Sequence, residues 1–329
     1  MKKIGVVVLN WNGAKLLEDF LPSVIAYSGE AKIYVADNAS TDDSVAVVKE
    51  RFPAVTIIQN DGNYGFAKGY NQALQHVEEE FYALVNSDIE VTKNWLAPIL
   101  SIFDAQAEIG IIQPKILDYK NKTYFEYAGA AGGFIDQYGY PYCRGRIFET
   151  LEKDNGQYDD ELDIFWASGA CFFIRKEIYR KLNGFDDDFF AHQEEIDLCW
   201  RAFNLGYKAK YTSESVVFHM GAATLIESNP KKTFLNFRNS LLMLTKNLPE
   251  NKIVPILFVR VILDGIAGIQ FIFMGKFIHC WAIIKAHFAF YSLINKMLKK
   301  RGGYQSGSYF HSPSIVYRYF IKNGTIFKK

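Results

Sequence analysis

The alternation of apolar strands with helical segments over the first ninety residues most constrains the fold of this chain. Four β-rich runs, at residues 4–9, 33–36, 55–58 and 81–85, are separated by segments with helical patterning. Runs that are almost continuously apolar are typical of strands buried on both faces of a parallel sheet. Repeated strand–helix–strand units therefore predict an α/β fold with a mostly parallel sheet and right-handed crossovers.

Polar side chains follow three of these runs, at the point where each strand is expected to end. They are Asn10 and Asn12, Asp37 and Asn38, and Asn86 and Asp88. In open α/β sheets, ligands bind outside the carboxyl ends of the strands. We therefore expect these residues to border a ligand site, where Asp37 would accept hydrogen bonds from a base or a ribose. The structural alternative for Asp37 is an Asx turn or a helix cap.

Asp88 is the candidate metal ligand at this edge. It follows the apolar run Phe81–Val85 and the polar pair Asn86-Ser87. Hard cations such as Mg²⁺ and Mn²⁺ take few protein ligands when phosphate oxygens supply the rest. A carboxylate at this position is therefore suited to hold a divalent metal against a diphosphate. Alternatively, Asp88 belongs to a turn before the helix expected near Trp95.

Two helix starts in this region carry further expectations. Gly65 opens a helix whose free N–H groups and positive dipole end suit a phosphate, and Lys68 would add charge. The alternative is a glycine needed only for a tight turn. Before the preceding helix, which is expected to reach about Arg51, Ser40 or Thr41 is the expected N-cap.

Several other nucleotide-binding and metal-binding classes are excluded by missing motifs. No Gly-x-Gly-x-x-Gly follows the first strand, and no P-loop lysine motif occurs in the chain. The four cysteines form no Cys-x-x-Cys pair and no zinc spacing. The sequence therefore predicts neither a dinucleotide fold nor a structural zinc site, and we expect no nucleic-acid partner.

Three acidic residues open a second informative helix. Glu194, Glu195 and Asp197 stand at its start, and Asp197 can pair with Arg201 four residues later. Acidic residues at a helix start are partly explained by the helix dipole. The alternative interpretation is that one of the three carboxylates is a general base.

Two basic candidates come later in the chain. His219 ends an alternating strand that begins at Lys208, and it is followed by small residues. A histidine in that position is a candidate metal ligand or phosphate contact, or alternatively a structural histidine. Arg238 is a candidate for electrostatic help to a leaving group, or alternatively a surface arginine on a helix. Residues 118–162 have weak periodicity and predict an insert of loops and short strands.

Eight segments, in order along the chain, resemble the family 2 inverting glycosyltransferases, especially the branch that includes rhamnosyltransferases of surface-polysaccharide assembly. The matching segments are residues 6–13, 35–42, 63–71, 84–88, 169–172 and 184–201, together with His219 and Arg238-Asn239. The resemblance covers roughly residues 4–245. It implies the GT-A fold, a nucleotide-diphosphate sugar as donor, and a glycan or lipid-linked hydroxyl as acceptor.

The resemblance also implies roles for individual residues. Asp37 matches the acid that binds the base or ribose, and Asp88 matches the acid that binds Mn²⁺ or Mg²⁺. Glu195 stands where the family usually has the aspartate of a Glu-Asp pair, the family's base. Asn86 stands in place of the first acid of the metal motif. Two rival readings stay open: a sugar-nucleotide pyrophosphorylase, and a sugar-nucleotide-binding scaffold protein without transferase activity.

The composition changes near residue 251, where we expect the catalytic domain (1–250) to give way to a helical region (251–329). From Ile253 onward there are eleven Lys and Arg and one acid, Asp264. The uncharged run Gly265–Gly275 has eleven residues, too short to span a bilayer. Apolar helices with basic flanks suit the surface of an anionic membrane.

The alternatives for this region are a helical subdomain packed on the catalytic core or a second subunit, and a spanning hairpin. The apolar run at the start of the chain ends at Asn10 and does not resemble a signal peptide. We therefore expect a cytoplasmic protein, peripheral at the inner face of the cell membrane.

Overall fold

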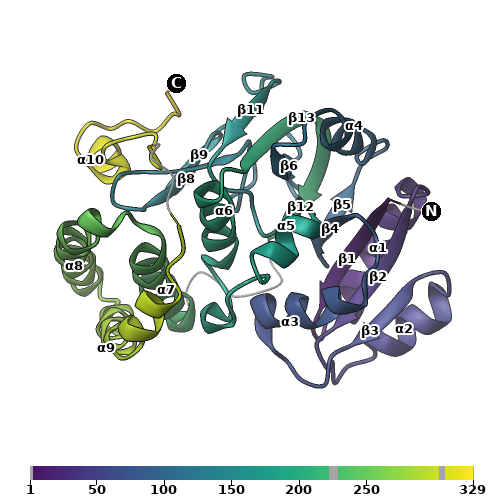
Figure 1. Ribbon diagram of the computed structural model, residues 1–329, viewed down its shortest axis with the longest axis horizontal. Helices are drawn as coiled ribbons and strands as arrows, with labels where there is room; N and C mark the ends of the chain where they lie inside the picture. The colour runs from purple at the N-terminus through teal and green to yellow at the C-terminus, as the bar shows by residue number, and fades with distance from the viewer. Residues whose placement is uncertain (1–2, 222–228, 304–307, 329) are drawn as a thin grey trace.

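The computed structural model describes residues 3–221, 229–303 and 308–328 of the chain. Within these residues, the centre is a nine-stranded sheet with helices on both faces (Figure 1). The strand order is β11-β13-β6-β12-β4-β1-β2-β3, and β5 pairs with β13. The predicted α/β class is therefore confirmed.

The first half of the sheet is parallel, as the alternation of strands and helices predicts. The elements are β1 (Ile4–Asn10), α1 (Ala14–Tyr27), β2 (Ala31–Asp37), α2 (Ser44–Arg51), β3 (Thr56–Gln59), α3 (Gly65–Ala73) and β4 (Phe81–Asn86). β1 pairs in parallel with β2 and with β4, and β2 pairs in parallel with β3. Each expected strand and helix of this region is present, but α3 ends at Ala73 and is followed by a 3₁₀ turn to His76, short of the predicted end at about Glu79.

The predicted cap of α2 is wrong. The helix begins at Ser44, whose amide donates to Asp42 Oδ1 at 3.0 Å. Ser40 and Thr41 instead bond to side chains at the ends of β1 and β2. The loop after β2 is therefore fastened to the loop after β1, and this use of the two hydroxyl residues cannot be told from a cap by spacing alone.

The second half of the sheet is mixed. Its strands are β5 (Ile89–Val91), β6 (Ile109–Asp118), β11 (Glu161–Ile164), β12 (Cys171–Arg175) and β13 (Lys208–His219). β12 runs antiparallel to both β4 and β6, whereas β6 and β13 are parallel. Two short helices, α4 (Ala97–Ala105) and α5 (Lys176–Lys181), follow β5 and β12. The insertion of β12 brings residues near position 170 next to the end of β4.

Residues 118–162 form the predicted insert of loops and short strands. Besides β11, it contains a small antiparallel sheet of β7 (Gly133–Ile135), β8 (Pro141–Cys143), β9 (Arg146–Ile147) and β10 (Thr150–Leu151). Buried apolar side chains such as Phe125 and Tyr142 join this insert to the main core. The insert is therefore part of the same globule.

Alternating residues of the central strands point to two separate layers of core. Val6 and Val8 of β1 pack with α1 and α4, whereas Val7 packs with α3, α5 and α6 (Glu194–Asn204). This is the period of two that a pleated strand imposes. The face with α3 and α6 lies on the side of the sheet toward the C-terminal helices (Figure 1).

The C-terminal region is helical, as predicted. It contains α7 (Pro230–Asn247), α8 (Glu250–Phe273), α9 (Phe277–Lys299) and α10 (Ile315–Phe320). Ile253, Phe290 and Met297 share a core cluster with Trp200 of α6, so these helices pack on the main domain. The predicted boundary near residue 250 falls between α7 and α8, and the division into two domains stays a prediction.

Two helices of this region, α8 and α9, are long and apolar enough to cross a membrane by length and composition. The helices, of 24 and 23 residues, are therefore longer than the eleven-residue uncharged run from which we judged the segment too short to span a bilayer. The reason is that Arg260 and Asp264, which interrupt the sequence, lie within α8 on its buried side.

Candidate active site

The register of the parallel strands brings the predicted polar residues to one edge of the sheet. Asn10 lies opposite Asp37, and Asn86 lies opposite Leu9. Asn10 Nδ2 donates to Asp37 Oδ1 at 3.0 Å, and both side chains are buried. Asn10 Oδ1 is buried without a partner among the described residues. Such an atom is typical of a place where a ligand or water completes the hydrogen bonding.

Asn12 and Asn38 hold the loops around this edge. Asn12 has a left-handed backbone, with φ of 51°, and its Oδ1 accepts from the Thr41 amide at 2.7 Å. Asn38 Nδ2 donates to the Gly65 carbonyl at 2.9 Å, and Asn38 Oδ1 accepts from Asn60 at 2.7 Å. Both asparagines thus shape the edge of the sheet, and their contact with a nucleotide stays a prediction.

The start of α3 does not have the free N–H groups that we expected. The Phe66 amide donates to the Phe190 carbonyl at 2.9 Å, and the Gly65 amide donates to Asn63 Oδ1 at 3.1 Å. Gly65 has φ of +69°, and a Cβ there would lie 2.6 Å from the Phe190 oxygen, so the position requires glycine. A phosphate would reach these amides only if Phe190 moved. Lys68 lies over a tyrosine ring, and its phosphate contact stays a prediction.

Asp88 and His219 come from different parts of the chain and meet at the same edge. His219 pairs with Ile89 of β5, which places His219 Nε2 3.2 Å from Asp88 Oδ1. His219 Nδ1 lies 3.1 Å from Glu126 Oε1, at the distance but not the angle of a hydrogen bond. Burial alone would lower the pKa of His219, but attraction to Glu126 and Asp88 outweighs it and raises the pKa to about 10.

The pair Asp88–His219 offers a carboxylate and an imidazole to a metal held jointly with a substrate, and such a metal would displace the proton that the raised pKa keeps on His219. Mn²⁺ accepts carboxylate oxygen and imidazole nitrogen, and a metal-binding histidine commonly has a carboxylate at its other ring nitrogen, where Glu126 stands here. Among the residues that the structure describes, no group of three or more His, Cys, Asp or Glu is arranged to hold a metal. A metal at this pair would therefore take its remaining ligands from a diphosphate.

Glu194 and Glu195 open α6 in an enclosed environment. Glu195 is partly exposed and Glu194 is buried, and the Oε2 atom of each is buried without a hydrogen bond among the described residues. Burial raises the pKa of Glu195 to about 7. Burial, and then the neighbouring Glu195 carboxylate, raise the pKa of Glu194 well above its ordinary value. A carboxylate with one free oxygen and a pKa near neutrality is suited to take a proton.

Asp197 has a different environment from the two glutamates. It is fully buried and accepts from Arg201 Nε at 2.8 Å, Lys246 Nζ at 2.9 Å and Asn247 Nδ2 at 2.7 Å. Burial would raise the pKa of Asp197, but Lys246 and Arg201 outweigh it and lower the pKa. The predicted Asp197–Arg201 pair is confirmed. Because both oxygens are engaged by protein groups, Asp197 is less free than Glu195 to take a proton, and the role of a base stays a prediction.

The segment that leads into α6, residues 186–193, is held by α7. Phe190, His192 and Gln193 have φ of 65°, 68° and 72°, in the left-handed region. Asn239 Nδ2 donates to three carbonyls of this segment, at 2.7 to 3.0 Å, and Arg238 donates to two, at 3.0 and 3.2 Å. Strained backbone persists where its surroundings determine it, often at active sites. Arg238 thus supports this loop, and its predicted electrostatic role stays a prediction.

Contacts through β12 connect the end of β4 with α6. The Asn86 amide donates to the Ala170 carbonyl at 2.9 Å. A Cβ on the adjacent Gly169 would lie 3.3 Å from a ring of α3 and 3.8 Å from Glu195 Cγ. Glu195 therefore lies beside the end of β4. That all the predicted acids border one cleft stays a prediction.

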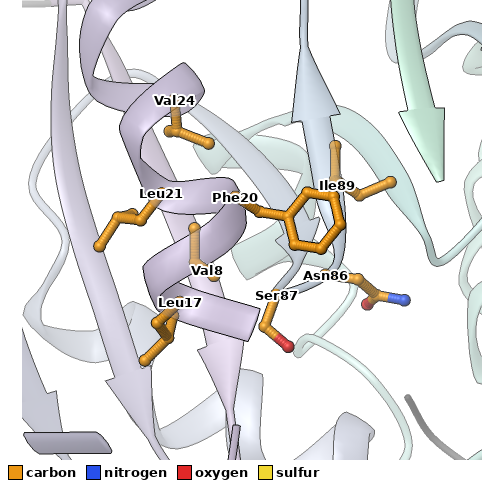
Figure 2. A pocket seen from close by; sticks show the side chains of 8 residues that line it. All are labelled: Val8, Leu17, Phe20, Leu21, Val24, Asn86, Ser87 and Ile89. Carbon is orange, nitrogen blue, oxygen red and sulfur yellow. The ribbon is translucent and has the colours of Figure 1, made fainter. Parts of the chain in front are cut away.

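An apolar pocket lies between α1 and the end of β4 (Figure 2). Side chains of α1 line it, and Asn86 turns its amide away from them. The space in it that a water-sized sphere can occupy is about 0 Å³, against the roughly 300–1,000 Å³ of typical ligand pockets. This pocket is therefore too small for a sugar nucleotide, which we expect outside the strand ends.

Three residues that contact the candidate site residues, or hold the loop before α6, were not predicted as site residues from the sequence. Glu126 lies in the insert, where no periodicity singles it out. Lys246 is a buried cation in α7, and the sequence offers no sign that its partners, Asp186 and Asp197, lie sixty and forty-nine residues away. Asn239 stands beside Arg238 in a segment that matched the family, and that match was the available signal.

A mixed α/β sheet with polar strand ends, an acid–histidine pair and an acidic helix start defines the GT-A class of glycosyltransferase folds. GalNAc-T7, solved with UDP, GalNAc and Mn²⁺, matches 74% of this chain at 17% identity, with a TM-score of 0.58. This chain spans 48% of the length of that structure. The Pyrobaculum calidifontis mannosyltransferase PcManGT, solved with GDP-Man and Mn²⁺, matches 93% of this chain and 76% of its own, at 16% identity and a TM-score of 0.54.

Residues 5–182 match the model of glycosyl transferase family 2, and the chain belongs to this family. An N-acetylglucosaminyl-diphospho-decaprenol L-rhamnosyltransferase of Mycobacterium tuberculosis is 22% identical over 232 residues, 66% of this chain and 75% of that protein. The rhamnosyltransferase WbbL of Escherichia coli K12 is 22% identical over 225 residues, 66% of this chain and 83% of its own.

Proposed function

We propose that this protein transfers a sugar from a nucleotide-diphosphate sugar to an acceptor hydroxyl, with inversion at the anomeric carbon. The observation that carries the proposal is the Glu195 carboxylate beside the end of β4, whose pKa is raised and whose Oε2 has no hydrogen bond among the described residues. Asp88 lies two residues beyond the end of β4, and His219 lies 3.2 Å from it. This pair supports the proposal. A site with a base and a separate place for a charged leaving group has what an inverting displacement requires.

In this reaction Glu195 would take the proton of the acceptor hydroxyl as its oxygen attacks the anomeric carbon. The bond to the nucleoside diphosphate breaks on the opposite face, and negative charge grows on the leaving group. Asp88 and His219 would hold Mn²⁺ or Mg²⁺, which when bound neutralises charge on a departing diphosphate. Asp37 and Asn10, whose Oδ1 has no partner within the described part of the chain, would receive the base or ribose.

The relatives supply the finer substrate proposal. Two of them are named rhamnosyltransferases, and one name specifies a lipid-diphosphate acceptor. We therefore propose rhamnose as the transferred sugar and a glycan or lipid-linked acceptor in surface-polysaccharide synthesis. A lipid-linked acceptor and the basic C-terminal region support a place at the inner face of the cell membrane.

A thermal-shift screen of nucleotide sugars, each with and without Mn²⁺, tests the donor proposal. We expect one nucleotide sugar to raise the melting temperature, and Mn²⁺ to enlarge the shift, because a ligand that binds only the folded state stabilises it. Turnover of that donor would establish the enzyme, whereas binding without transfer or hydrolysis would favour the scaffold protein. The absence of a shift with any nucleotide sugar would contradict both.

Replacing Asp88 by asparagine should remove the metal dependence of donor binding. Loss of an outer carboxylate partner typically costs about 10–100-fold in metal affinity, and loss of a ligand should cost more. Glu126→Gln, which leaves Asp88 and His219 in place, is the graded comparison and should fall within that range. Titration of donor with and without Mn²⁺ measures both variants. Equal donor affinity in the presence and absence of metal for wild type and Asp88→Asn would refute the assignment.

A further inference from the structure

The helices α8 and α9 form a hairpin that turns several polar side chains toward the rest of the protein. The two helices pack against each other and are connected by residues 274–276 (Figure 1). Arg260 and Asp264, in the middle of α8, are 3% and 0% exposed. His279 near the start of α9 is also buried, and His287 is largely enclosed. We call this side, which faces the rest of the protein, the inner face.

The inner face of α8 is bonded to the body of the protein. Arg260 donates to the Tyr138 carbonyl at 2.9 Å and to Ser240 Oγ of α7 at 2.6 Å. Asp264 Oδ2 lies 3.1 Å from His287 Nε2, and Asp264 Oδ1 accepts from Tyr140 at 3.4 Å. Tyr138 and Tyr140 belong to the loop between β7 and β8. The middle of α8 is therefore attached to the catalytic body.

The inner face of α9 is attached at both ends. His279 Nδ1 lies 2.8 Å from Thr233 Oγ1 of α7. At the other end, Lys296 donates to Asp188 Oδ1 at 2.6 Å, and Lys300 donates to Asp188 Oδ2 at 2.7 Å. The helix therefore lies along the body over its whole length.

The opposite side of the hairpin, the outer face, is exposed and apolar. Its large side chains, each at least 40% exposed, include Val254, Phe258, Ile262, Ile266, Ile269, Ile272, Phe273, Met274, Phe277, Ile278, Trp281, Ile284, Phe288 and Tyr291. Soluble monomers rarely expose contiguous apolar patches larger than a few hundred Å². A side of the hairpin with this many exposed apolar side chains is expected to be covered by another molecule or by a membrane.

We propose that the α8–α9 hairpin lies flat in the surface of an anionic lipid bilayer, with its outer face in the acyl boundary, and that neither helix crosses the membrane. Crossing would pull Arg260 and Asp264 away from Tyr138 and Ser240 and put them in hydrocarbon, which is costly. An in-plane helix instead keeps every inner-face contact and covers the outer face.

Charge identifies the lipid as anionic. Lys276 and Lys285 are exposed on the hairpin, and the one acid after Ile253, Asp264, is turned inward. The outer face and its rim therefore present positive charge, which attracts anionic headgroups and opposes pairing with a second copy of the same face. The proposed docking on the membrane does not depend on the transferase proposal. The purpose we assign to the docking, which is to reach a lipid-linked acceptor, does rest on the proposed transferase function.

Flotation of the full-length protein with vesicles tests the docking. We expect binding to vesicles of phosphatidylcholine with phosphatidylglycerol, weaker binding to phosphatidylcholine alone, and loss of the difference at high salt. Phe258→Asp with Ile266→Asp should weaken partitioning roughly 100-fold or more, since two large apolar side chains no longer enter the lipid. Tyr27→Asp, at an exposed aromatic residue on α1, is the matched control and should bind normally. No binding to either vesicle, or a stable dimer that buries this face, would overturn the proposal.

A thiol in the α8–α9 connection distinguishes in-plane docking from crossing. In a Cys280→Ser background, Lys276→Cys should react with a membrane-impermeant maleimide added outside sealed vesicles, and not with reagent trapped inside. Labelling from inside would show that the hairpin crosses and would overturn the in-plane arrangement. Nucleotide-sugar thermal shifts of the same variants should match wild type, so failure of the membrane proposal and failure of the transferase proposal are seen separately.

Discussion

Replacing Glu195 by glutamine is expected to lower the rate of sugar transfer by about 10²–10⁴-fold, the typical contribution of a positioned general base. Glutamine keeps the size of the side chain but cannot take a proton. Donor binding should survive, because Glu195 lies beside the end of β4 and not among the residues proposed to hold the nucleotide. Initial rates with the donor found by the screen, together with its affinity, measure the two effects.

The pH dependence of the same reaction gives a second signature. Because burial raises the pKa of Glu195 to about 7, the wild-type rate should fall as pH drops through that value, where the base becomes protonated. Glu195→Gln should lose this limb of the profile. Glu177→Gln, at the exposed start of α5, is the matched control and should keep both rate and profile. Near-normal turnover of Glu195→Gln would reassign the base, with Glu194 the next candidate.

Replacing Lys246 by methionine is expected to destabilise the fold by about 3–5 kcal/mol, the typical cost of removing one partner of a buried ion pair. Lys246 Nζ lies 2.7 Å from Asp186 Oδ2 and 2.9 Å from Asp197 Oδ2, and all three side chains are almost fully buried. The substitution leaves two buried carboxylates with reduced compensation. Arg201 and Lys300 remain near them, so we expect the lower end of this range. Chemical denaturation measures the free energy of unfolding.

The control for this prediction is an exposed ion pair. Lys208→Met removes the partner of Asp163, 3.0 Å away on the surface, and should change stability by no more than about 1 kcal/mol.

The pKa of Asp197 is lowered in the folded protein. Its paired charge therefore stabilises the fold above the unfolded pKa of about 4, and this contribution is lost as pH falls. The deficit of Lys246→Met should shrink in acid, and a variant as stable as Lys208→Met at neutral pH would contradict the assignment.

Patterns local in the sequence predicted the elements of the fold well. The apolar runs of β1 and β4 and the helical spacing of α1 are each complete within a dozen or so residues, so their bounds follow from composition. The ion pair of Asp197 with Arg201 is one helical turn apart and was predicted for the same reason. The acidic start of α6 also pointed to the glutamates whose environment the structure now describes.

Features made by distant parts of the chain were not predictable. The amides at the start of α3 are bonded to Phe190, which lies more than a hundred residues later. The antiparallel direction of β12 depends on its neighbours in the sheet and leaves no local mark. In α8, the charges of Arg260 and Asp264 seemed to break an apolar segment, whereas their partners are Tyr138, Tyr140 and α7.

The position of β13 within the sheet has a consequence for dissecting the protein. The match to the family ends at residue 182, but β13, formed by Lys208–His219, lies between β6 and β11. A fragment that ends at residue 182 would lack β13 and would leave the long, apolar strand β6 as an unpaired edge strand. Exposed apolar edge strands promote aggregation. The segment that the family model matches is therefore shorter than the smallest fragment expected to fold by itself.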